Sequence, residues 1–139
     1  MPRYLAVDYG TKRIGLAISD GRGVIASPLT TVSARGSLVE QVETVVDAVH
    51  EFDVDALVVG LPVNMDDTEG GQAAITRRFG GALGTRFGKP VHYFDERLST
   101  VAADEMLRPA ELTRKKRKAR TDAVAAQVIL QSFLDGQRG

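Results

Sequence analysis

The sequence predicts an α/β protein in which a mixed central β-sheet carries helices on both faces. Two observations lead to this prediction. Short apolar runs of strand length alternate with longer segments in which apolar residues recur at helical spacing, a pattern typical of a sheet packed against helices. The 139 residues are 43% hydrophobic and 26% charged, which is the composition of an ordinary globular domain, and we expect one domain over residues 1–139.

The first part of the chain is expected to form strands. Tyr4–Val7 and Ile14–Ile18 are short apolar runs joined by a glycine-containing turn, which predicts a β-hairpin. Val24–Val32 is expected to be a third strand. Pro28 within it favours an edge position or a bulge, because proline cannot donate a backbone hydrogen bond to a neighbouring strand.

Helices and strands alternate in the rest of the chain. Ser37, with Glu40 three residues later, has the pattern of a capping box, and helical periodicity follows as far as Phe52. The further elements that we expect are a strand at Ala56–Val59, a helix at Gln72–Phe87, a strand at Pro90–Phe94, a helix from Ser99 or Thr100 to Leu107, and a last helix from Asp122 to Leu134, ended by Gly136. The predicted order is therefore β-β-β-α-β-α-β-α-α.

Three acidic residues stand where a metal site could form. Asp8 follows the apolar run Tyr4–Val7, and Glu96 follows Val91–Asp95. Ligands of open α/β sheets gather just beyond such strand ends. Asp122 opens the last expected helix, and apolar residues three, four, seven and eleven positions later place it on the face that packs on the sheet. An unpaired charge there would be costly, and a divalent cation is one possible partner.

Each acid alone has a simpler interpretation as a turn or helix-capping residue, so the prediction depends on the three together. Carboxylate oxygens suit Mg²⁺ or Mn²⁺, and a few of them can hold two such ions roughly 3.5–4 Å apart. One ion would activate water and the other would stabilise the leaving oxygen of a phosphodiester. That chemistry needs no cysteine, of which the chain has none, and no histidine, so we interpret His50 and His92 as structural or solvated.

Basic residues are concentrated just before Asp122. Residues 108–120 contain seven basic residues and one acid, in a chain whose formal net charge is zero. We expect an exposed, mobile loop from Arg114 to Arg120 that becomes ordered on nucleic acid, because adjacent cations repel one another and Pro109 disfavours a continuous helix. A solvated surface run is the alternative. The expected phosphate contacts are Lys12 and Arg13 of the hairpin turn and Arg114, Lys115, Lys116, Arg117, Lys118 and Arg120.

Four segments, in order and over nearly the whole chain, carry a family resemblance: VDYGTKRIGLAISD (Val7–Asp20), VVGLPVNMDDTEGGQA (Val58–Ala73), FDERLST (Phe94–Thr100) and RKKRKARTDAVAAQVILQSFLD (Arg114–Asp135). They resemble the YqgF family, also called RuvX, of RuvC-like resolvases. The resemblance implies a ribonuclease H-like fold and a nuclease in the 5′-end maturation of 16S ribosomal RNA. It also implies that Asp8, Glu96 and Asp122 are the catalytic and metal-binding acids. Of the neighbours Asp95 and Glu96, it selects Glu96.

Two details of these segments lead to further expectations. Family members often have glycine at the position of Asp67, and we assign no role to the loop Asp66-Asp67-Thr68-Glu69. Gly10 and Gly15 flank the turn beside Asp8, where glycine would permit positive φ and close approach of a substrate phosphate.

Other functions remain open from the sequence. The same chemistry would serve a Holliday-junction resolvase acting on branched DNA, which we would expect to be a dimer. A non-catalytic nucleic-acid-binding module is a third possibility, although retention of three acids argues against it. The hairpin at Asp8–Arg13 also resembles the phosphate loop of actin-like sugar kinases, but those enzymes enclose a nucleotide between two such domains and this chain has room for one.

The partners and location follow from the same observations. We expect RNA or structured DNA as the partner, with the protein a monomer or a homodimer. The N-terminus has no apolar core of signal-peptide length, and the longest apolar run, near Ala56–Val63, is too short to cross a bilayer. We therefore expect a cytoplasmic protein without a membrane partner.

Overall fold

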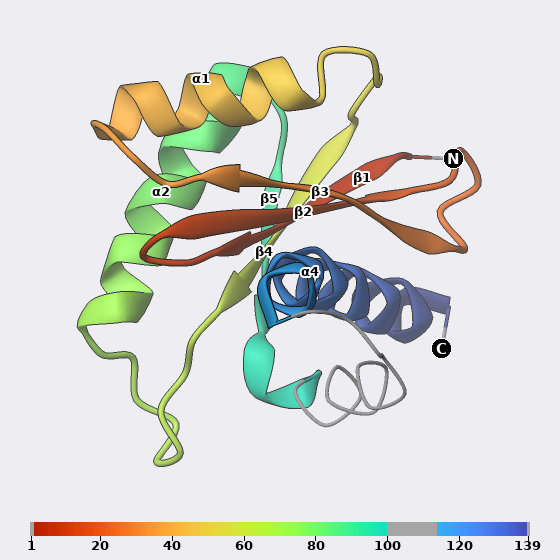
Figure 1. Ribbon diagram of the computed structural model, residues 1–139. Helices are drawn as coiled ribbons and strands as arrows, with labels where there is room; N and C mark the ends of the chain where they lie inside the picture. Colours follow the sequence, from red (N-terminus) through yellow and green to blue (C-terminus); the bar gives the residue numbers. More distant parts are fainter. Residues whose placement is uncertain (1, 100–113, 139) are drawn as a thin grey trace.

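Five strands form one mixed sheet in the order β3-β2-β1-β4-β5 (Figure 1). The computed structural model describes residues 2–99 and 114–138. The strands are β1 (Tyr4–Tyr9), β2 (Arg13–Ser19), β3 (Ala26–Ser33), β4 (Ala56–Leu61) and β5 (Val91–Asp95). β2 is antiparallel to both β1 and β3, while β4 is parallel to β1 and to β5. The predicted hairpin and the mixed sheet are both confirmed.

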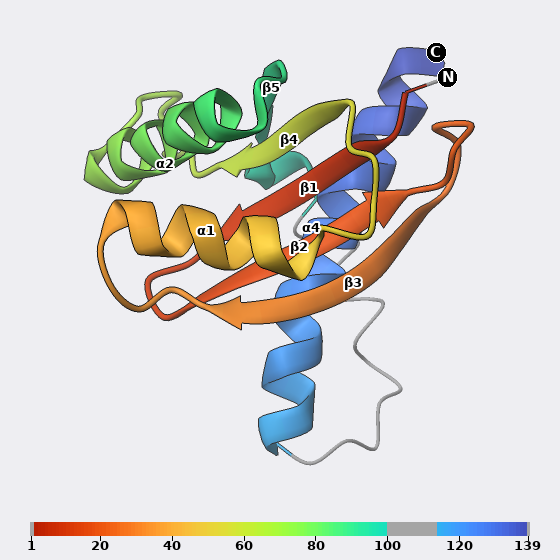
Figure 2. The same cartoon turned by 90° about the horizontal axis from the view of Figure 1, so that it is seen from above.

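Helices cover both faces of this sheet. Helices α1 (Leu38–Ala48) and α2 (Gly71–Phe87) lie against each other on one face, and α4 (Arg114–Arg138) crosses the other (Figures 1 and 2). α4 contacts β1, β2, β3 and β4. In the described part of the chain, no helix is long and apolar enough to span a membrane.

Side chains along each strand point alternately to the two faces of the sheet, so the apolar side chains form two cores. The core under α1 and α2 includes Leu5, Val7, Leu57, Val59 and Phe79. The core under α4 includes Ala6, Ala17, Val58, Ala126 and Leu130. Because successive side chains of a strand point to opposite faces, Asp8, which follows two residues after Ala6, lies on the α4 face of the sheet.

The local signals near β3 and α1 are confirmed. β3 is an edge strand, and its pairing with β2 shifts register between Leu16 and Ala17, where Pro28 stands opposite. The Ser37 hydroxyl accepts a hydrogen bond from the Glu40 amide, and the Glu40 carboxylate accepts one from the Ser37 amide, which completes the capping box. α1 ends at Ala48, earlier than Phe52.

The last helix differs from the prediction. α4 begins at Arg114, so the expected loop over residues 114–120 is wrong, and Asp122 lies inside the helix rather than at its start. Lysine, arginine and alanine favour helix, and each added residue extends a helix that is already anchored by packing. The first turns of α4 lie beyond the edge strand β3 (Figure 2). At the other end the helix continues through Gly136 to Arg138.

A short 3-10 turn, η1 (Glu96–Leu98), follows β5, and Ser99 caps its C-terminal end. The helix expected from Ser99 or Thr100 to Leu107 falls, apart from Ser99, outside the described residues. α2 begins one residue before the predicted start and ends at Phe87 as predicted. Gly88, in the left-handed conformation at φ 66°, terminates it.

Candidate active site

Asp8 and Glu96 meet on the α4 face of the sheet, near the carboxyl ends of its parallel strands. Asp8 is on β1, and Glu96 directly follows β5. β4 lies between these strands, and Gly60 occupies the position between the two acids. A Cβ atom on Gly60 would lie 2.9 Å from Glu96 Oε1 and 2.7 Å from Ile129 Cδ1. The missing side chain therefore leaves the space through which Glu96 reaches across β4.

The side chains of Asp8 and Glu96 share a hydrogen bond. Burial raises the pKa of Glu96 to about 8, together with the hydrogen bond to Asp8 and the negative charges of Asp8 and Asp95. Burial also raises the pKa of Asp8; the hydrogen bond from Glu96 opposes this effect and the charge of Asp122 adds to it. At neutral pH, Glu96 is therefore the protonated donor and Asp8 the acceptor.

Asp122 is the third acid of the predicted set. Its carboxylate Oδ2 accepts a hydrogen bond from Arg13 Nε at 2.6 Å, and both side chains are partly buried. A Cβ atom on Gly15 would lie 2.5 Å from the carbonyl carbon of Asp122 and closer still to its carbonyl oxygen. Gly15 stands opposite Asp8 in the β1–β2 ladder. The absence of a side chain at Gly15 thus allows the α4 backbone to pack closely against β2 beside Asp8.

The structure pairs Asp8 with Glu96 and places Asp122 close enough for its charge to raise the pKa of Asp8, but the arrangement of the three is that of charge-compensated groups. Within residues 2–99 and 122–137, no three acidic or histidine side chains stand close enough to hold one ion as they lie. A proton balances the Asp8–Glu96 pair, and Arg13 balances Asp122. Carboxylate oxygens that need such compensation are the donors that Mg²⁺ and Mn²⁺ prefer. The three acids therefore fit a divalent cation in their donor chemistry, but not in the present spacing of their side chains.

The glycine prediction is partly wrong. Neither Gly10 nor Gly15 has a positive φ; the described glycines that do are Gly23, Gly36 and Gly88. Protein backbone comes close to both glycines, and the expected approach of a substrate phosphate stays a prediction. Gly15 adjoins α4, and a Cβ atom on Gly10 would lie 2.7 Å from the carbonyl oxygen of Arg13. Gly60 was not anticipated, and its one sequence signal is a glycine inside an otherwise apolar strand.

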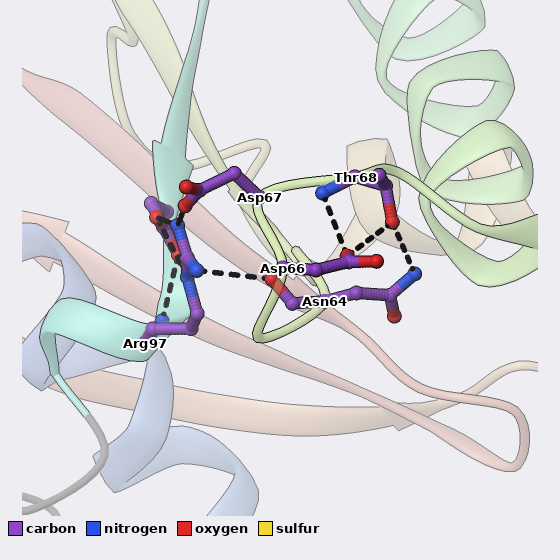
Figure 3. Close-up of polar contacts among 6 residues, drawn as sticks. Asn64, Asp66, Asp67, Thr68 and Arg97 are labelled. Carbon is purple, nitrogen blue, oxygen red and sulfur yellow. Dashed lines mark hydrogen bonds and ion pairs between the residues drawn. The ribbon is translucent and has the colours of Figure 1, made fainter.

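Arg97, the residue after Glu96 in the chain, binds both the loop that follows β4 (Figure 3) and Asp95 at the end of β5. Its Nη2 atom donates to Asp95 Oδ2 at 2.7 Å and to Asp67 Oδ1 at 3.0 Å, and its Nη1 atom donates to the Asn64 carbonyl at 2.9 Å. The hydrogen bonds from Arg97 lower the pKa of Asp95. The Asp95 carboxylate is thus bound by Arg97, and Glu96 is the neighbour whose side chain binds Asp8.

The loop itself is internally bonded. The Asp66 carboxylate accepts hydrogen bonds from the amide and the hydroxyl of Thr68, and the Asp67 amide donates to the Asn64 carbonyl. Asp67 has φ 70°, the only positive φ among the described non-glycine residues. This conformation suits glycine, the residue that the family resemblance led us to expect at this position. The sequence had indicated neither the loop's role nor Arg97.

The fold is that of RuvC. The structure of T. thermophilus RuvC in complex with Holliday junction substrate aligns over 100% of this chain and 97% of that chain, with a TM-score of 0.63 and 16% identity. A second Thermus thermophilus RuvC structure aligns over 99% and 96%, with a TM-score of 0.59 and 17% identity. These likenesses define the class of protein as α/β with the ribonuclease H-like fold.

Sequence comparison gives the family. The family described as "RuvX: Holliday junction resolvase" matches residues 2–136, and the chain belongs to it. A "Putative pre-16S rRNA nuclease" of Moorella thermoacetica is 45% identical over 139 residues, 99% of each chain. One of the same name from Chloroflexus aurantiacus is 46% identical over 134 residues, 96% of this chain and 87% of that protein. The family resemblance of the four sequence segments is confirmed.

Proposed function

We propose that this protein is a divalent-metal-dependent nuclease that hydrolyses phosphodiester bonds in the 5′-end processing of precursor 16S ribosomal RNA. The observation that carries the proposal is the partly buried Asp8–Glu96 pair with Asp122 beside it. The names of full-length relatives at about 45% identity support the substrate. With such a substrate, we expect the protein to act in the cytoplasm.

The three carboxylates would be the ligands of a site for Mg²⁺ or Mn²⁺. A pair of such ions, when bound, supplies an activated water and a counter-charge for the leaving oxygen. To serve as ligands, Glu96 must lose the proton that it shares with Asp8, and Asp122 must separate from Arg13. Arg13 is then a cation without a partner at the edge of the site, free to contact a substrate phosphate.

We expect cations of two segments to hold the substrate. Lys12 is in the β1–β2 turn and Arg13 is the first residue of β2, and both adjoin Asp122. The other group belongs to the first turns of α4, which lie beyond β3 (Figure 2). We assign phosphate contacts to Lys12, Arg13, Arg114, Lys115, Lys116, Arg117, Lys118 and Arg120. Phosphate contacts of this kind provide affinity without sequence preference.

A second candidate function is resolution of branched DNA, which the family description and the fold of RuvC favour. A resolvase cuts two strands symmetrically and requires two copies of the site, so we would then expect a homodimer. A processing nuclease can act as a monomer. Light scattering of the protein alone separates these two expectations.

The test is cleavage of a precursor 16S RNA fragment and of a four-way DNA junction, side by side, with Mg²⁺, Mn²⁺ or a chelator. We expect metal-dependent shortening of the RNA at its 5′ end. Asp8→Asn should abolish cleavage but retain or strengthen binding, because it removes a negative charge that faces phosphate. Asp47→Asn, an exposed acid on α1, is the matched control and should cleave normally. Cutting of the junction alone would favour the resolvase, and binding without cleavage of either substrate would overturn the proposal.

A further inference from the structure

A groove leads away from the acids along the tip of the β1–β2 hairpin. A hollow of about 270 Å³ is lined by residues 10–13 of the turn and by Asp122. A larger hollow of about 890 Å³ is lined by Thr11, Lys12 and Arg13, and by residues 31–35 at the end of β3. The two share three turn residues. Together they form one depression, here called the hairpin groove, that starts at Asp122 and ends at Arg35.

The hairpin groove is positively charged. Its larger part is lined by Lys12, Arg13 and Arg35 and by no acidic residue of the described chain. Lys12 and Arg35 are exposed, and no described carboxylate forms an ion pair with either. Three other arginines of the described chain are paired with acids: Arg77 with Glu69, Arg86 with Glu43, and Arg97 with Asp95 and Asp67. Cations elsewhere in the described chain also lack an ion pair, but Lys12 and Arg35 lie in a groove that begins at Asp122, so a polyanion bound by them would lie close to the acids.

The backbone holds these cations in a fixed relation. Ser33 pairs with Arg13 in the β2–β3 ladder. The Ala34 amide donates a hydrogen bond of 3.0 Å to the Lys12 carbonyl, which ties the turn to the end of β3. The capped N-terminus of α1 begins two residues after Arg35. Because the attachment points are set by the sheet, binding a phosphate here orders the side chains alone, and the loss of conformational entropy is small.

We propose that the hairpin groove binds the phosphodiester backbone of the RNA strand beside the bond that is cut, with Lys12 and Arg35 contacting separate phosphates. The inference deepens the proposed nuclease function and rests on it. It adds Arg35 to the nucleic-acid contacts and gives the strand a direction, from Asp122 over the hairpin tip towards the start of α1.

The test is the salt dependence of binding to a single-stranded RNA oligonucleotide, measured by fluorescence anisotropy in a chelator over a range of KCl concentrations. Lys12→Gln and Arg35→Gln are compared singly and together. The controls are Lys89→Gln and Arg22→Gln, two exposed cations that lie before β5 and between β2 and β3, and so at the opposite end of the sheet. Circular dichroism checks that each variant folds.

Each phosphate contact on single-stranded nucleic acid contributes about 0.7 to the slope of log K against log salt. We therefore expect the slope to fall by about 0.7 in each single variant and by about 1.4 in the double variant, with both controls unchanged. An unchanged slope in the double variant would overturn the inference, as would an equal fall in the controls. A fall on branched DNA but not on RNA would overturn the assignment to an RNA strand.

Because binding is measured without metal, this result is separate from the proposed chemistry. Cleavage of precursor RNA together with an unchanged slope would refute the role of the hairpin groove but not the proposed nuclease function. A reduced slope in the variants, without metal-dependent cleavage by the wild type, would refute the nuclease function but not the role of the groove in binding. The two failures are therefore distinguishable in one set of variants.

Discussion

Replacing Gly15 with alanine should separate α4 from β2 and displace Asp122. The new Cβ atom would lie 2.5 Å from the carbonyl carbon of Asp122, where ordinary contact begins at 3.4 Å. The two backbones must therefore move apart by more than about 0.9 Å, because the carbonyl oxygen is closer still and neither partner is the end of a flexible side chain. β2 is paired on both sides by β1 and β3, so we expect the helix to move and to carry Asp122 with it.

The expected effects on stability and on rate differ in size. Forcing one methyl group into a packed contact costs about 1–3 kcal/mol, which for a domain of this size lowers the melting temperature by roughly 3–10 °C. A misplacement of about 1 Å in a catalytic constellation can cost about 100-fold in rate. Gly15→Ala should therefore fold, melt slightly earlier and cleave RNA about two orders of magnitude more slowly.

The assay is metal-dependent RNA cleavage at saturating substrate, with thermal unfolding in a chelator. Gly81→Ala is the matched control, since a Cβ atom there meets nothing within 4 Å. It lies in α2, where alanine should raise stability by about 0.5–1 kcal/mol and leave cleavage unchanged. If Gly15→Ala cleaves at the wild-type rate, the contact between β2 and α4 does not set the position of Asp122, and the reasoning fails.

Two other predictions concern charge and backbone conformation. In metal-free buffer, the contribution of Glu96 to the free energy of unfolding should fall from about pH 4.5 to about pH 8, because over this range the folded state keeps a proton, at a pKa of about 8, that the unfolded chain loses at its ordinary 4.5. Glu96→Gln should flatten this part of a urea-unfolding profile, and an unchanged profile would contradict the assignment. Asp67→Gly should leave the midpoint of urea unfolding nearly unchanged, whereas Asp67→Ala should lower it. Both variants remove an exposed ion pair with Arg97, which contributes little to stability. They differ because glycine accepts φ 70° without strain and alanine does not. Equal midpoints for the two variants would show that backbone strain at Asp67 is negligible.

Local patterns in the sequence predicted most of the fold. The capping box at Ser37, the hairpin and the edge strand containing Pro28 each depend on a few neighbouring residues, and each is present. The start of α4 was mispredicted because a run of cations is ambiguous: repulsion favours an open loop, while the helix propensity of the same residues and the packing of the following turns favour a helix. The packing of the following turns determines where the helix starts, and that packing involves residues distant in the sequence.

The acids of the site could be found from strand ends and helix periodicity, but their partners could not. Arg13 and Asp122 are 109 positions apart in the sequence, and Arg97 and Asp67 are 30 positions apart. Gly60 makes space for Glu96 and Ile129, which come from two other elements. Such contacts depend on how elements pack, and one sequence does not reveal which distant residues will meet.

The most direct test of the central claim is a crystal structure of the protein soaked in Mn²⁺, with anomalous scattering used to locate the ions. The account predicts anomalous peaks between the carboxylates of Asp8, Glu96 and Asp122, with the Arg13 side chain withdrawn from Asp122, and loss of those peaks in Asp8→Asn. Peaks bound elsewhere, or a site that stays free of Mn²⁺ at a concentration that supports cleavage, would contradict it.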